Sequence, residues 1–538
     1  MTPSDNSATP RPDSTGPSDP ADSQGPAGAQ GSSDKQRFTP EQRRILLLSF
    51  VVAFLSLLSV SIVNVVLPSI ESSMNASSAA LQWILSGYAL AFGVVLVASG
   101  RAGDIFGRGK LFVIGLVLFG LGSLSAGLAA EPLWLNASRV IMGLGSGLLN
   151  PQVTGLIQQY FRGAQRGTAF GLFGGVIGVS VAVGPVLGGV LIALLGPEWG
   201  WRSAFLINVP FVVLGIIGAF LWLPASAWRP AEDRSDTDRQ GPQRTESAVG
   251  EHHSEPEHAR PGRKHTLADL DPMGVVLLSA GILLIMLPFV EREVGAAIWF
   301  SLPAGAAFIL LWTWWERRFA RAGRAPMVDL SLFTTRSFAN GAALITLYFL
   351  GMTSVWVILA LWMQQGLGHT ALAAGLIGLP SAIMTAILSP IAGSHVTRVG
   401  RSMVLWGILL ALAGLTLTGT AVVLHYTMGT SEWWLLGTLA VLGSGQAFVV
   451  GPNQTLTLAE VPIRYAGTAG GVLQTGQRVG TSIGIAMITG VVFSLVAAAG
   501  WATAFAVGLG VIAVCISVAG VVGIIDLRQG RKVPGAKR

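Results

Sequence analysis

Cysteine and histidine are scarce in this sequence. Cys515 is the one cysteine among 538 residues, so it has no second cysteine for a disulfide or a cysteine metal site. The seven histidines avoid the middles of the long apolar stretches. Four of them share one hydrophilic segment, which could bind a metal ion only loosely and is more simply explained as solvated. They are His252, His253, His258 and His265. We therefore expect no metal and no cofactor.

Charge is also scarce. Charged residues make up 11% of the chain, hydrophobic residues make up 51%, and the mean hydropathy is +0.61. A soluble protein with so few charges could not cover its surface, so this composition predicts a protein that crosses a lipid bilayer many times. Each crossing needs about 20 apolar residues, and the chain supplies about fourteen such runs.

The predicted spans also lack the groups that enzymes and nucleotide-driven pumps need. No GxxxxGK[ST] loop occurs, and no span offers paired acids or a nucleophile beside a base. We therefore expect no enzymatic activity. No carboxylate falls deep inside a predicted span; those near spans lie at helix ends or in loops. They are Asp104, Asp269, Asp271, Glu291, Glu293, Glu460 and Asp526.

The net charge of +7 is distributed in a way that orients a membrane protein. Basic residues cluster in alternate loops, and the intervening loops have almost none apart from Arg202 and Arg292. This positive-inside pattern places both termini in the cytoplasm and argues against nucleic acid as a partner. The clusters are Arg43 and Arg44, Arg101 to Lys110, Arg162 and Arg166, Arg317 to Arg324, Arg398 and Arg401, and Arg528 to Arg538.

Two polar segments divide the chain. Residues 1–40 and 229–266 are rich in small, polar and charged residues and have no apolar face, so we expect both to be disordered. The first has no basic stretch directly before a cleavable apolar segment, so it is not a signal peptide. The expected division is 1–40 as a disordered cytoplasmic tail, 41–227 as a six-helix bundle, 228–270 as a polar cytoplasmic linker, 271–322 as two inserted membrane helices, 323–527 as a second six-helix bundle, and 528–538 as a basic cytoplasmic tail.

A charged, glycine-rich run separates the second and third apolar stretches. It reads GRAGDIFGRGK and begins at Gly100. Gly100, Gly103 and Gly107 permit a tight reversal of the chain at a membrane surface. Asp104 can meet helix N-termini or basic groups, and Arg108 lies on the positive side of the membrane.

Two short patterns occur in both halves of the chain. They pair spans that correspond if the plan is six spans, two inserted spans and six more, and such repeats are typical of secondary transporters. The second copy of the charged run is degraded, because a threonine replaces its aspartate. The matching positions are Gly100 with Gly393, Asp104 with Thr397, Gly107–Arg108 with Gly400–Arg401, and Gly167–Thr168–Ala169 with Gly467–Thr468–Ala469.

Further patterns lie in spans one, four, five and six. The first span ends SIVNVVLPSI from Ser61, the fourth carries Arg139, and WRSAFLINVP begins at Trp201. The fifth span reads GVIGVSVAVGPVLGG, in which a proline bends the helix and glycines let a neighbouring helix pack closely. Together with the charged run, these patterns resemble the major facilitator superfamily, and within it the fourteen-span drug:proton antiporters.

The resemblance implies the fold, the location and the first functional residues. The fold would be an all-α polytopic membrane protein with two six-helix bundles and two inserted helices, fourteen in total, in the bacterial cytoplasmic membrane. The charged run, with Gly100, Gly103, Asp104, Gly107 and Arg108, would be a conformational latch on the cytoplasmic side. The antiporter motif would be Gly178, Gly184, Pro185, Gly188 and Gly189.

One position departs from that family. Its first span usually has an aspartate five residues before the Asn of the VNV triplet, and here that position is Ser59. Serine cannot carry the proton. If protons are used, Asp104, Glu291 or Glu460 would have to serve.

Two arginines, Arg139 and Arg478, are instead the deep charges. A lone charge near the bilayer centre costs about 2.5–3.5 kcal/mol on insertion scales, so each should face a cavity or a partner, and Arg139 could equally brace backbone carbonyls. Two deep cations favour a neutral or anionic substrate. The candidates for the substrate path are Ser59, Ser61, Asn64, Gln82, Trp83, Tyr88, Arg139, Asn150, Gln364, Asn453, Gln474 and Arg478, and each polar residue could equally form an interhelical hydrogen bond.

These observations predict a secondary active transporter that exports drugs or other amphipathic small molecules, driven by the proton gradient. Its partners would be a small-molecule substrate, protons and the lipid bilayer. The alternative is a dedicated exporter of an endogenous metabolite or lipid that is not proton-coupled, and the serine at position 59 favours it.

Overall fold

The computed structural model describes residues 37–230, 266–291 and 295–530. Within these residues every regular element is a helix. Lipid offers no partners for backbone N–H and C=O groups, and a helix satisfies them internally. The predictions for the four linker histidines, for most of the N-terminal tail and for most of the basic C-terminal tail fall outside the described residues.

The helices follow the apolar runs of the sequence. The longer ones are α1 (Pro40–Met74), α2 (Ser78–Phe106), α3 (Arg108–Gly127), α4 (Pro132–Tyr160), α5 (Gly163–Leu206), α6 (Asn208–Trp222), α8 (Pro272–Val290), α9 (Ser301–Arg321), α10 (Arg336–Leu361), α12 (Leu379–Val399), α13 (Arg401–Met428), α14 (Leu435–Thr457) and α15 (Ala466–Gly530). A short α11 (Ala371–Leu376) precedes α12, and a 3₁₀ turn (Ile463–Tyr465) precedes α15. Helix α1 begins at a capping box, in which Thr39 and Gln42 satisfy each other's backbone N–H groups.

Twelve of the described segments are long and apolar enough to cross a membrane. Two of them, Gly163–Trp222 with 60 residues and Ile463–Gln529 with 67, far exceed the about 20 residues that one crossing needs. Each contains a glycine that leaves the helical conformation, Gly196 with φ of 77° and Gly500 with φ of 75°.

The chain reverses at these glycines. Beyond Gly500, a Cβ placed on Gly508 would lie 2.8 Å from a methyl group of Val492, a residue that a straight helix would hold about 24 Å away. The prediction of fourteen spans counts each long segment as two, and that division stays a prediction.

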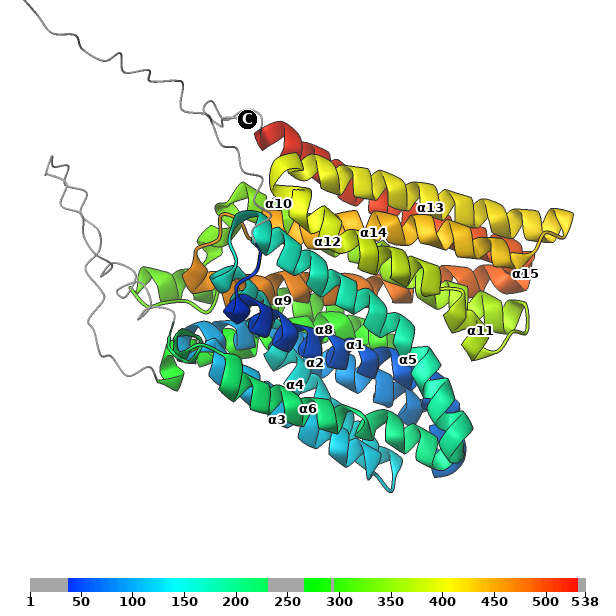
Figure 1. The fold of residues 1–538 in the computed structure, drawn as a ribbon, viewed down its shortest axis with the longest axis horizontal. Helices are drawn as coiled ribbons and strands as arrows, with labels where there is room; N and C mark the ends of the chain where they lie inside the picture. Colours follow the sequence, from blue (N-terminus) through cyan, green and yellow to red (C-terminus); the bar gives the residue numbers. More distant parts are fainter. Residues whose placement is uncertain (1–36, 231–265, 292–294, 531–538) are drawn as a thin grey trace, which may run out of the picture. The chain divides into compact units, whose positions relative to one another are not determined.

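The helices pack in two sets, which two helix pairs then connect. Among the N-terminal helices (α1–α6), α1 packs along α5, and α4 packs along α2 and α3. Among the C-terminal helices (α10–α15), α10 packs along α15, and α14 packs along α12 and α13. Helix α5 lies against α12 and α2 against α15, and these contacts connect the two sets (Figure 1). Helices α8 and α9 form a hairpin whose α8 contacts both α2 and α15.

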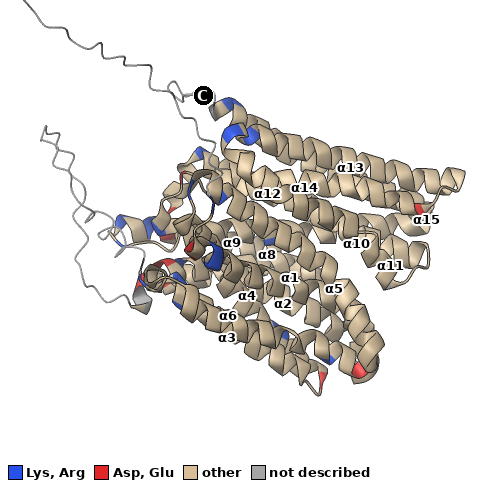
Figure 2. Cartoon of the chain, in the orientation of Figure 1, with Lys and Arg blue, Asp and Glu red and all other residues tan. Residues whose placement is uncertain are grey.

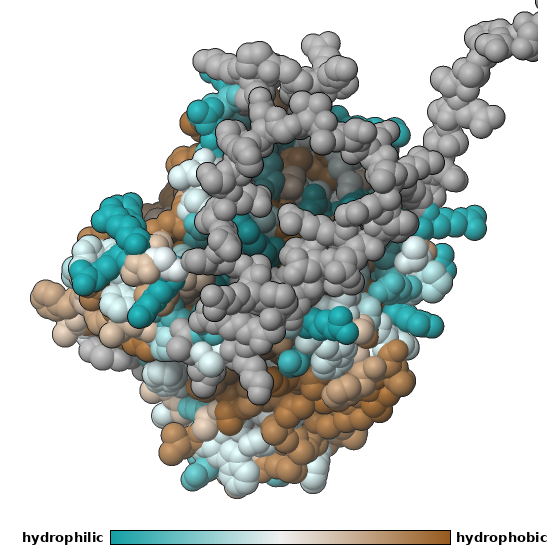
Figure 3. Space-filling model, turned by 90° about the vertical axis from the view of Figure 1, so that its left-hand side faces the viewer, coloured by the Kyte–Doolittle hydropathy of each residue, from teal (hydrophilic) through white to brown (hydrophobic). Residues whose placement is uncertain are grey.

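Charge is concentrated at one end of the helices. Lys and Arg gather at the left-hand helix ends in Figure 2, and the middles of the helices are nearly free of charge. Figure 3 looks onto that end and shows hydrophilic side chains there, with an apolar flank below. Helices α3 and α6 lie on that side in Figure 1 and expose large apolar side chains, including Leu121, Leu214 and Leu221. Such a flank suits contact with lipid.

Candidate functional site

Helix α2 ends and α3 begins at a single residue, Gly107. Its φ of +104° is a conformation that glycine adopts readily and other residues rarely. A Cβ here would also lie 2.5 Å from the carbonyl oxygen of Trp228. At Gly103 the reason for glycine is space, because a Cβ would overlap the side-chain amide of Gln152 on α4. The charged run therefore forms a sharp turn held tightly against α4.

Asp104 caps a helix that lies far away in the sequence. Its Oδ1 accepts a hydrogen bond from the backbone N–H of Gly467 at 3.1 Å. Its Oδ2 accepts from the backbone N–H of Thr468 at 2.9 Å and from the Thr468 hydroxyl at 3.0 Å. These N–H groups belong to the first turn of α15, where a helix has no carbonyl partners of its own. A carboxylate at such an end satisfies the donors and complements the helix dipole.

Arg108 completes this contact. Its guanidinium pairs with Asp104 at 2.9 Å, and neither side chain is exposed by more than 1%. It also donates to the carbonyl of Gly155 on α4 at 2.9 Å and to the carbonyl of Ile463, just before α15, at 2.8 Å. One buried ion pair thus ties α2, α3 and α4 to the start of α15, across the boundary between the N-terminal and C-terminal helices.

The repeated glycines of the sequence meet each other in space. The backbone of Gly100 packs against Gly467, and the backbone of Gly393 packs against Gly167. In each pair a Cβ would collide with the carbonyl oxygen of the partner. The two copies of the charged run thus make equivalent close contacts, each with the GTA pattern of the opposite set of helices.

The second copy lacks the capping carboxylate. Thr397 occupies the position equivalent to Asp104 and is exposed. Arg401, the equivalent of Arg108, pairs with Asp526 and donates to Asn453 within the C-terminal helices. Of the two charged contacts, only the first therefore connects the two sets of helices.

Gln158 adds a further connection that the sequence analysis missed. Its side-chain amide on α4 donates to the carbonyls of Leu458 at 2.9 Å and Val461 at 3.1 Å, beside the start of α15. Gln158 was not selected because a glutamine near a helix end has no distinguishing pattern.

The glycines of the antiporter motif lie on two faces of α5. Gly184 packs on Ser61 of α1, and Gly188 lies against Ile62 of the same helix. Gly178 faces Thr385 of α12 in the C-terminal helices. Two neighbouring positions also face those helices: Pro185 contacts Gly375, and Gly189 faces Leu372. Helix α5 therefore uses small residues to approach α1 on one face and the C-terminal helices on another.

The Gly184 contact leads to a stability prediction. A Gly184→Ala variant should melt at a lower temperature, because the added Cβ overlaps the Ser61 hydroxyl and overpacking costs about 1–3 kcal/mol. Thermal unfolding followed by fluorescence-detected size exclusion measures this. Adding Ser61→Ala should recover part of the loss. Equal melting temperatures for Gly184→Ala and the original protein would contradict the close contact.

Most polar candidates for the substrate path are engaged with neighbouring helices. Three side chains are exposed instead, those of Asn64, Trp83 and Gln364, and the buried Ser59 hydroxyl has no hydrogen-bond partner among the described residues. The engaged groups are Ser61 with the carbonyl of Ser180, Gln82 with the carbonyl of Val290, Tyr88 with Ser56 and Ser146, Asn150 with Ser56 and Ser146, Asn453 with Gly341 and Arg401, and Gln474 with Thr154.

The two deep arginines occupy different surroundings. Arg139 is fully buried and donates to the carbonyls of Ile84 at 2.8 Å and Ser59 at 3.4 Å, so it braces α4 against α2 and α1. Arg478 on α15 is half-buried and lies over the ring of Phe92 on α2 at 4.1 Å. The hydrogen bonds of Arg139 therefore support its bracing role, whereas Arg478 donates to no backbone carbonyl in the part of the chain that the structure describes.

The α8–α9 hairpin contains two buried carboxylates whose tryptophan partners the sequence analysis did not identify. Trp312 donates to Glu316 at 2.9 Å, and Trp315 donates to Asp271 at 2.9 Å. The sequence also predicts that Trp312, Trp314 and Trp315 form an interfacial belt. The structure contradicts this for Trp312, which is 7% exposed, whereas Trp314 is exposed and Trp315 is partly buried with its indole N–H donating to Asp271.

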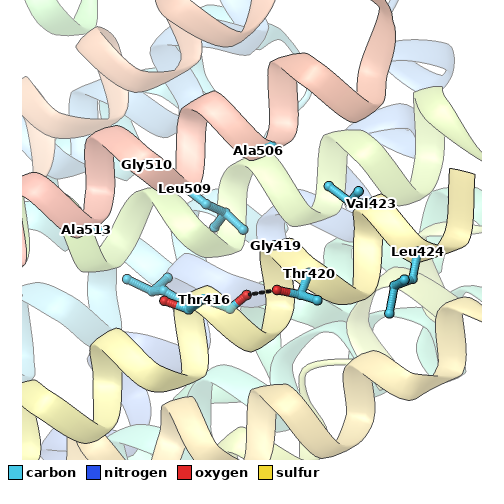
Figure 4. Close-up of a pocket in the computed structure, with 10 residues that line it drawn as sticks. Thr416, Gly419, Thr420, Val423, Leu424, Ala506, Leu509, Gly510 and Ala513 are labelled. Atoms are coloured by element: carbon cyan, nitrogen blue, oxygen red, sulfur yellow. Dashed lines mark hydrogen bonds between the residues drawn. The ribbon is translucent and has the colours of Figure 1, made fainter. Parts of the chain in front are cut away.

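A cavity of about 390 Å³ lies outside this set of residues, between α13 and the last part of α15 (Figure 4). Leu415, Val423 and Leu509 line it, and its two threonine hydroxyls donate to backbone carbonyls of their own helix. Its polar groups are therefore already satisfied. Among the described residues no group of three or more His, Cys, Asp or Glu side chains could hold a metal ion.

Known proteins resemble this chain over most of its length. The family described as the Major Facilitator Superfamily matches residues 49–485 and 341–537. A probable actinorhodin transporter from Streptomyces coelicolor is 32% identical over 483 residues, which cover 88% of this chain and 76% of that protein. The multidrug resistance protein Stp from Mycobacterium tuberculosis is 28% identical over 447 residues, covering 81% and 73%.

Solved structures share the fold at low sequence identity. The proton:xylose symporter XylE superposes with a TM-score of 0.60 at 16% identity, covering 91% of this chain and 96% of XylE. The human organic anion transporter MFSD10 superposes with a TM-score of 0.57 at 17% identity, covering 90% and 100%.

Proposed function

This chain belongs to the Major Facilitator Superfamily, and on that basis we propose that it is a secondary active transporter that exports drugs or other amphipathic small molecules by alternating access. Its relatives, a probable actinorhodin transporter and a multidrug resistance protein, support export of such compounds. Placement in a bacterial cell membrane with both termini in the cytoplasm is part of the proposal. The gathering of Lys and Arg at one end of the helices supports that orientation (Figure 2).

The observation that carries the proposal is the capping of α15 by Asp104. The contact joins residues 363 positions apart in the sequence and consists of hydrogen bonds at a helix end. Such a contact can break and re-form as rigid helix bundles separate, without any change inside either bundle. We propose that it closes the cytoplasmic side of the transporter in one state and releases in the other.

We propose that the proton gradient drives export and that Glu291 carries the proton. The carboxylates of Asp104 and Asp526 are each already engaged in an ion pair with an arginine. Glu291 follows α8, is 5% exposed, and accepts a hydrogen bond from the Ser86 hydroxyl on α2 at 3.0 Å. A hydroxyl can remain bonded to a carboxyl group in either protonation state, so this contact is compatible with proton exchange.

Efflux of the fluorescent aromatic anion anthracene-9-carboxylate from vesicles, with a pH gradient and a membrane potential imposed separately, tests this proposal. We expect efflux to follow the pH gradient. A Glu291→Gln variant should lose at least nine-tenths of that efflux. The matched control is Glu432→Gln, because Glu432 bonds His369 and lies in the C-terminal helices. Undiminished pH-driven efflux in Glu291→Gln would exclude Glu291 as the carrier.

A dedicated exporter of an endogenous metabolite or lipid remains the second candidate. The observation that favours it is Ser59, a buried hydroxyl where a proton-carrying acid would be expected. This candidate predicts no anthracene-9-carboxylate efflux under either gradient. Export of an anion could instead use the membrane potential, which is worth about 2.3 kcal/mol per charge at 100 mV.

A further inference from the structure

Two arginines and two aromatic rings form a continuous stack between α4 and α15. The guanidinium of Arg139 lies 4.3 Å from the ring centre of Tyr88. The Tyr88 ring is stacked with that of Phe92, one turn along α2, with 6.0 Å between centroids. The guanidinium of Arg478 lies 4.1 Å from the ring centre of Phe92. We call these four side chains the arginine–aromatic stack.

The stack crosses the boundary that alternating access would open. Arg139, Tyr88 and Phe92 belong to α4 and α2 of the N-terminal helices, whereas Arg478 belongs to α15. The contact between Arg478 and Phe92 is therefore one that separates when the two sets of helices move apart. Separation would expose one face of Phe92 and the guanidinium of Arg478 to the space between them.

Positive charge in the stack is uncompensated. Among the described residues neither guanidinium forms an ion pair with a carboxylate, and the rings of Tyr88 and Phe92 lie between them. Arg139 donates from its Nε and Nη1 to backbone carbonyls, but its buried Nη2 has no hydrogen-bond partner among the described residues. Arg478 has the ring of Phe92 as its contact and no hydrogen bond to any described residue. The stack therefore carries positive charge and free N–H donors that an anionic ligand could satisfy.

We propose that the arginine–aromatic stack is the substrate site and that it selects planar aromatic compounds bearing a carboxylate or phenolate. The proposal rests on the export function proposed above. The fork of the Arg478 guanidinium can bind a carboxylate with two parallel hydrogen bonds, while the substrate ring takes the place of the guanidinium over Phe92. Like charge disfavours an aromatic cation at the same place.

Equilibrium binding to the purified full chain in nanodiscs tests this proposal without requiring transport. The probes are anthracene-9-carboxylate and 9-(aminomethyl)anthracene, which share a fluorescent ring and carry opposite charges. We expect the carboxylate to bind at least tenfold more tightly than the amine. Arg478→Gln should weaken carboxylate binding at least tenfold, and Arg478→Lys should retain part of it because the charge remains but the fork is lost.

The matched control is Arg398→Gln, because Arg398 is exposed near the end of α12 and undergoes the same change of side chain. Its carboxylate affinity should equal that of the original protein. Three results would overturn the proposal: no saturable carboxylate binding, tighter binding of the amine, or unchanged carboxylate affinity in a folded Arg478→Gln variant. Carboxylate binding without gradient-driven efflux of any compound would contradict the proposed export function but not the proposed binding site.

Discussion

An Asp104→Asn variant will lose at least nine-tenths of its transport activity while reaching the membrane in normal amounts. Asp104 accepts the backbone N–H groups of Gly467 and Thr468 and is the acidic partner of the buried Arg108. Asparagine keeps one oxygen and presents an NH₂ group where a second acceptor is needed. Removing one partner of a buried ion pair costs about 3–5 kcal/mol, so the closed arrangement should be disfavoured by a factor of at least about 100.

A single cysteine can report whether the contact has opened. Thr154 is fully buried on α4 and accepts hydrogen bonds from Gln454 and Gln474 of the C-terminal helices. In a Cys515→Ser background, Thr154→Cys should be protected from a membrane-impermeant thiol reagent in inverted vesicles. Adding Asp104→Asn should make it react at least tenfold faster.

The control for this experiment is Glu460→Gln, which neutralises a nearby acid that bonds Ser337 and caps no helix. We expect normal transport and a protected cysteine at position 154. Full transport together with a protected cysteine in Asp104→Asn would show that the capping of α15 does not close the protein.

The residues of the charged run could be selected from the sequence, but the partners of Asp104 could not. Glycine at a reversal and an acid beside helix ends are local signals, because they depend on backbone conformation and helix termini. Which helix the carboxylate caps depends on the packing of α2 against α15, and Gly467 lies 363 positions away. The repeat identified the four glycines that make the contacts, because it matched Gly100 with Gly393 and Gly167 with Gly467, but it did not identify which of them meet. In the structure the contacts run across those pairs, from Gly100 to Gly467 and from Gly167 to Gly393.

Side-chain roles inside the membrane were harder to assign, for two reasons. The same amide can bind a substrate or a neighbouring helix, so residue type alone could not distinguish the roles of Gln82 and Asn150. Tryptophan is frequent at membrane interfaces, which suggested the belt. The indole of Trp312 instead donates to Glu316 one turn along α9, and the indole of Trp315 donates to Asp271. The second contact depends on how α8 and α9 pack, which no local pattern encodes.

The absence of a carboxylate at Thr397 has a physical explanation in where the facing helices begin. Helix α15 starts at Ala466, so Gly467 and Thr468 lie in its first turn and their N–H groups need an outside acceptor. Helix α5 starts at Gly163, so the N–H groups of Gly167 and Thr168 already have carbonyl partners one turn earlier. A carboxylate at position 397 would have no free helix end to cap. The second contact therefore depends on glycine packing alone.

Gly100→Val and Gly393→Val will each hold the two sets of helices apart and reduce transport below one-tenth. Each added side chain would overlap a backbone carbonyl, of Gly467 or of Gly167, and a backbone cannot move aside as a flexible side chain can. The labelling rate of Thr154→Cys in the same Cys515→Ser background measures the separation, and both variants should label at least tenfold faster. Gly490→Val is the matched control, since a Cβ there meets nothing within 4 Å.

Comparing Gly100→Val with Gly393→Val distinguishes the effect of close glycine packing from the effect of helix capping by Asp104. Gly100 lies beside the Asp104 contact, whereas Gly393 lies where no carboxylate caps a helix. If close packing is required at both places, Gly393→Val should abolish transport as completely as Gly100→Val. Normal transport in Gly393→Val with loss in Gly100→Val would mean that the capped contact alone closes the protein, and that the second pair of glycines is dispensable.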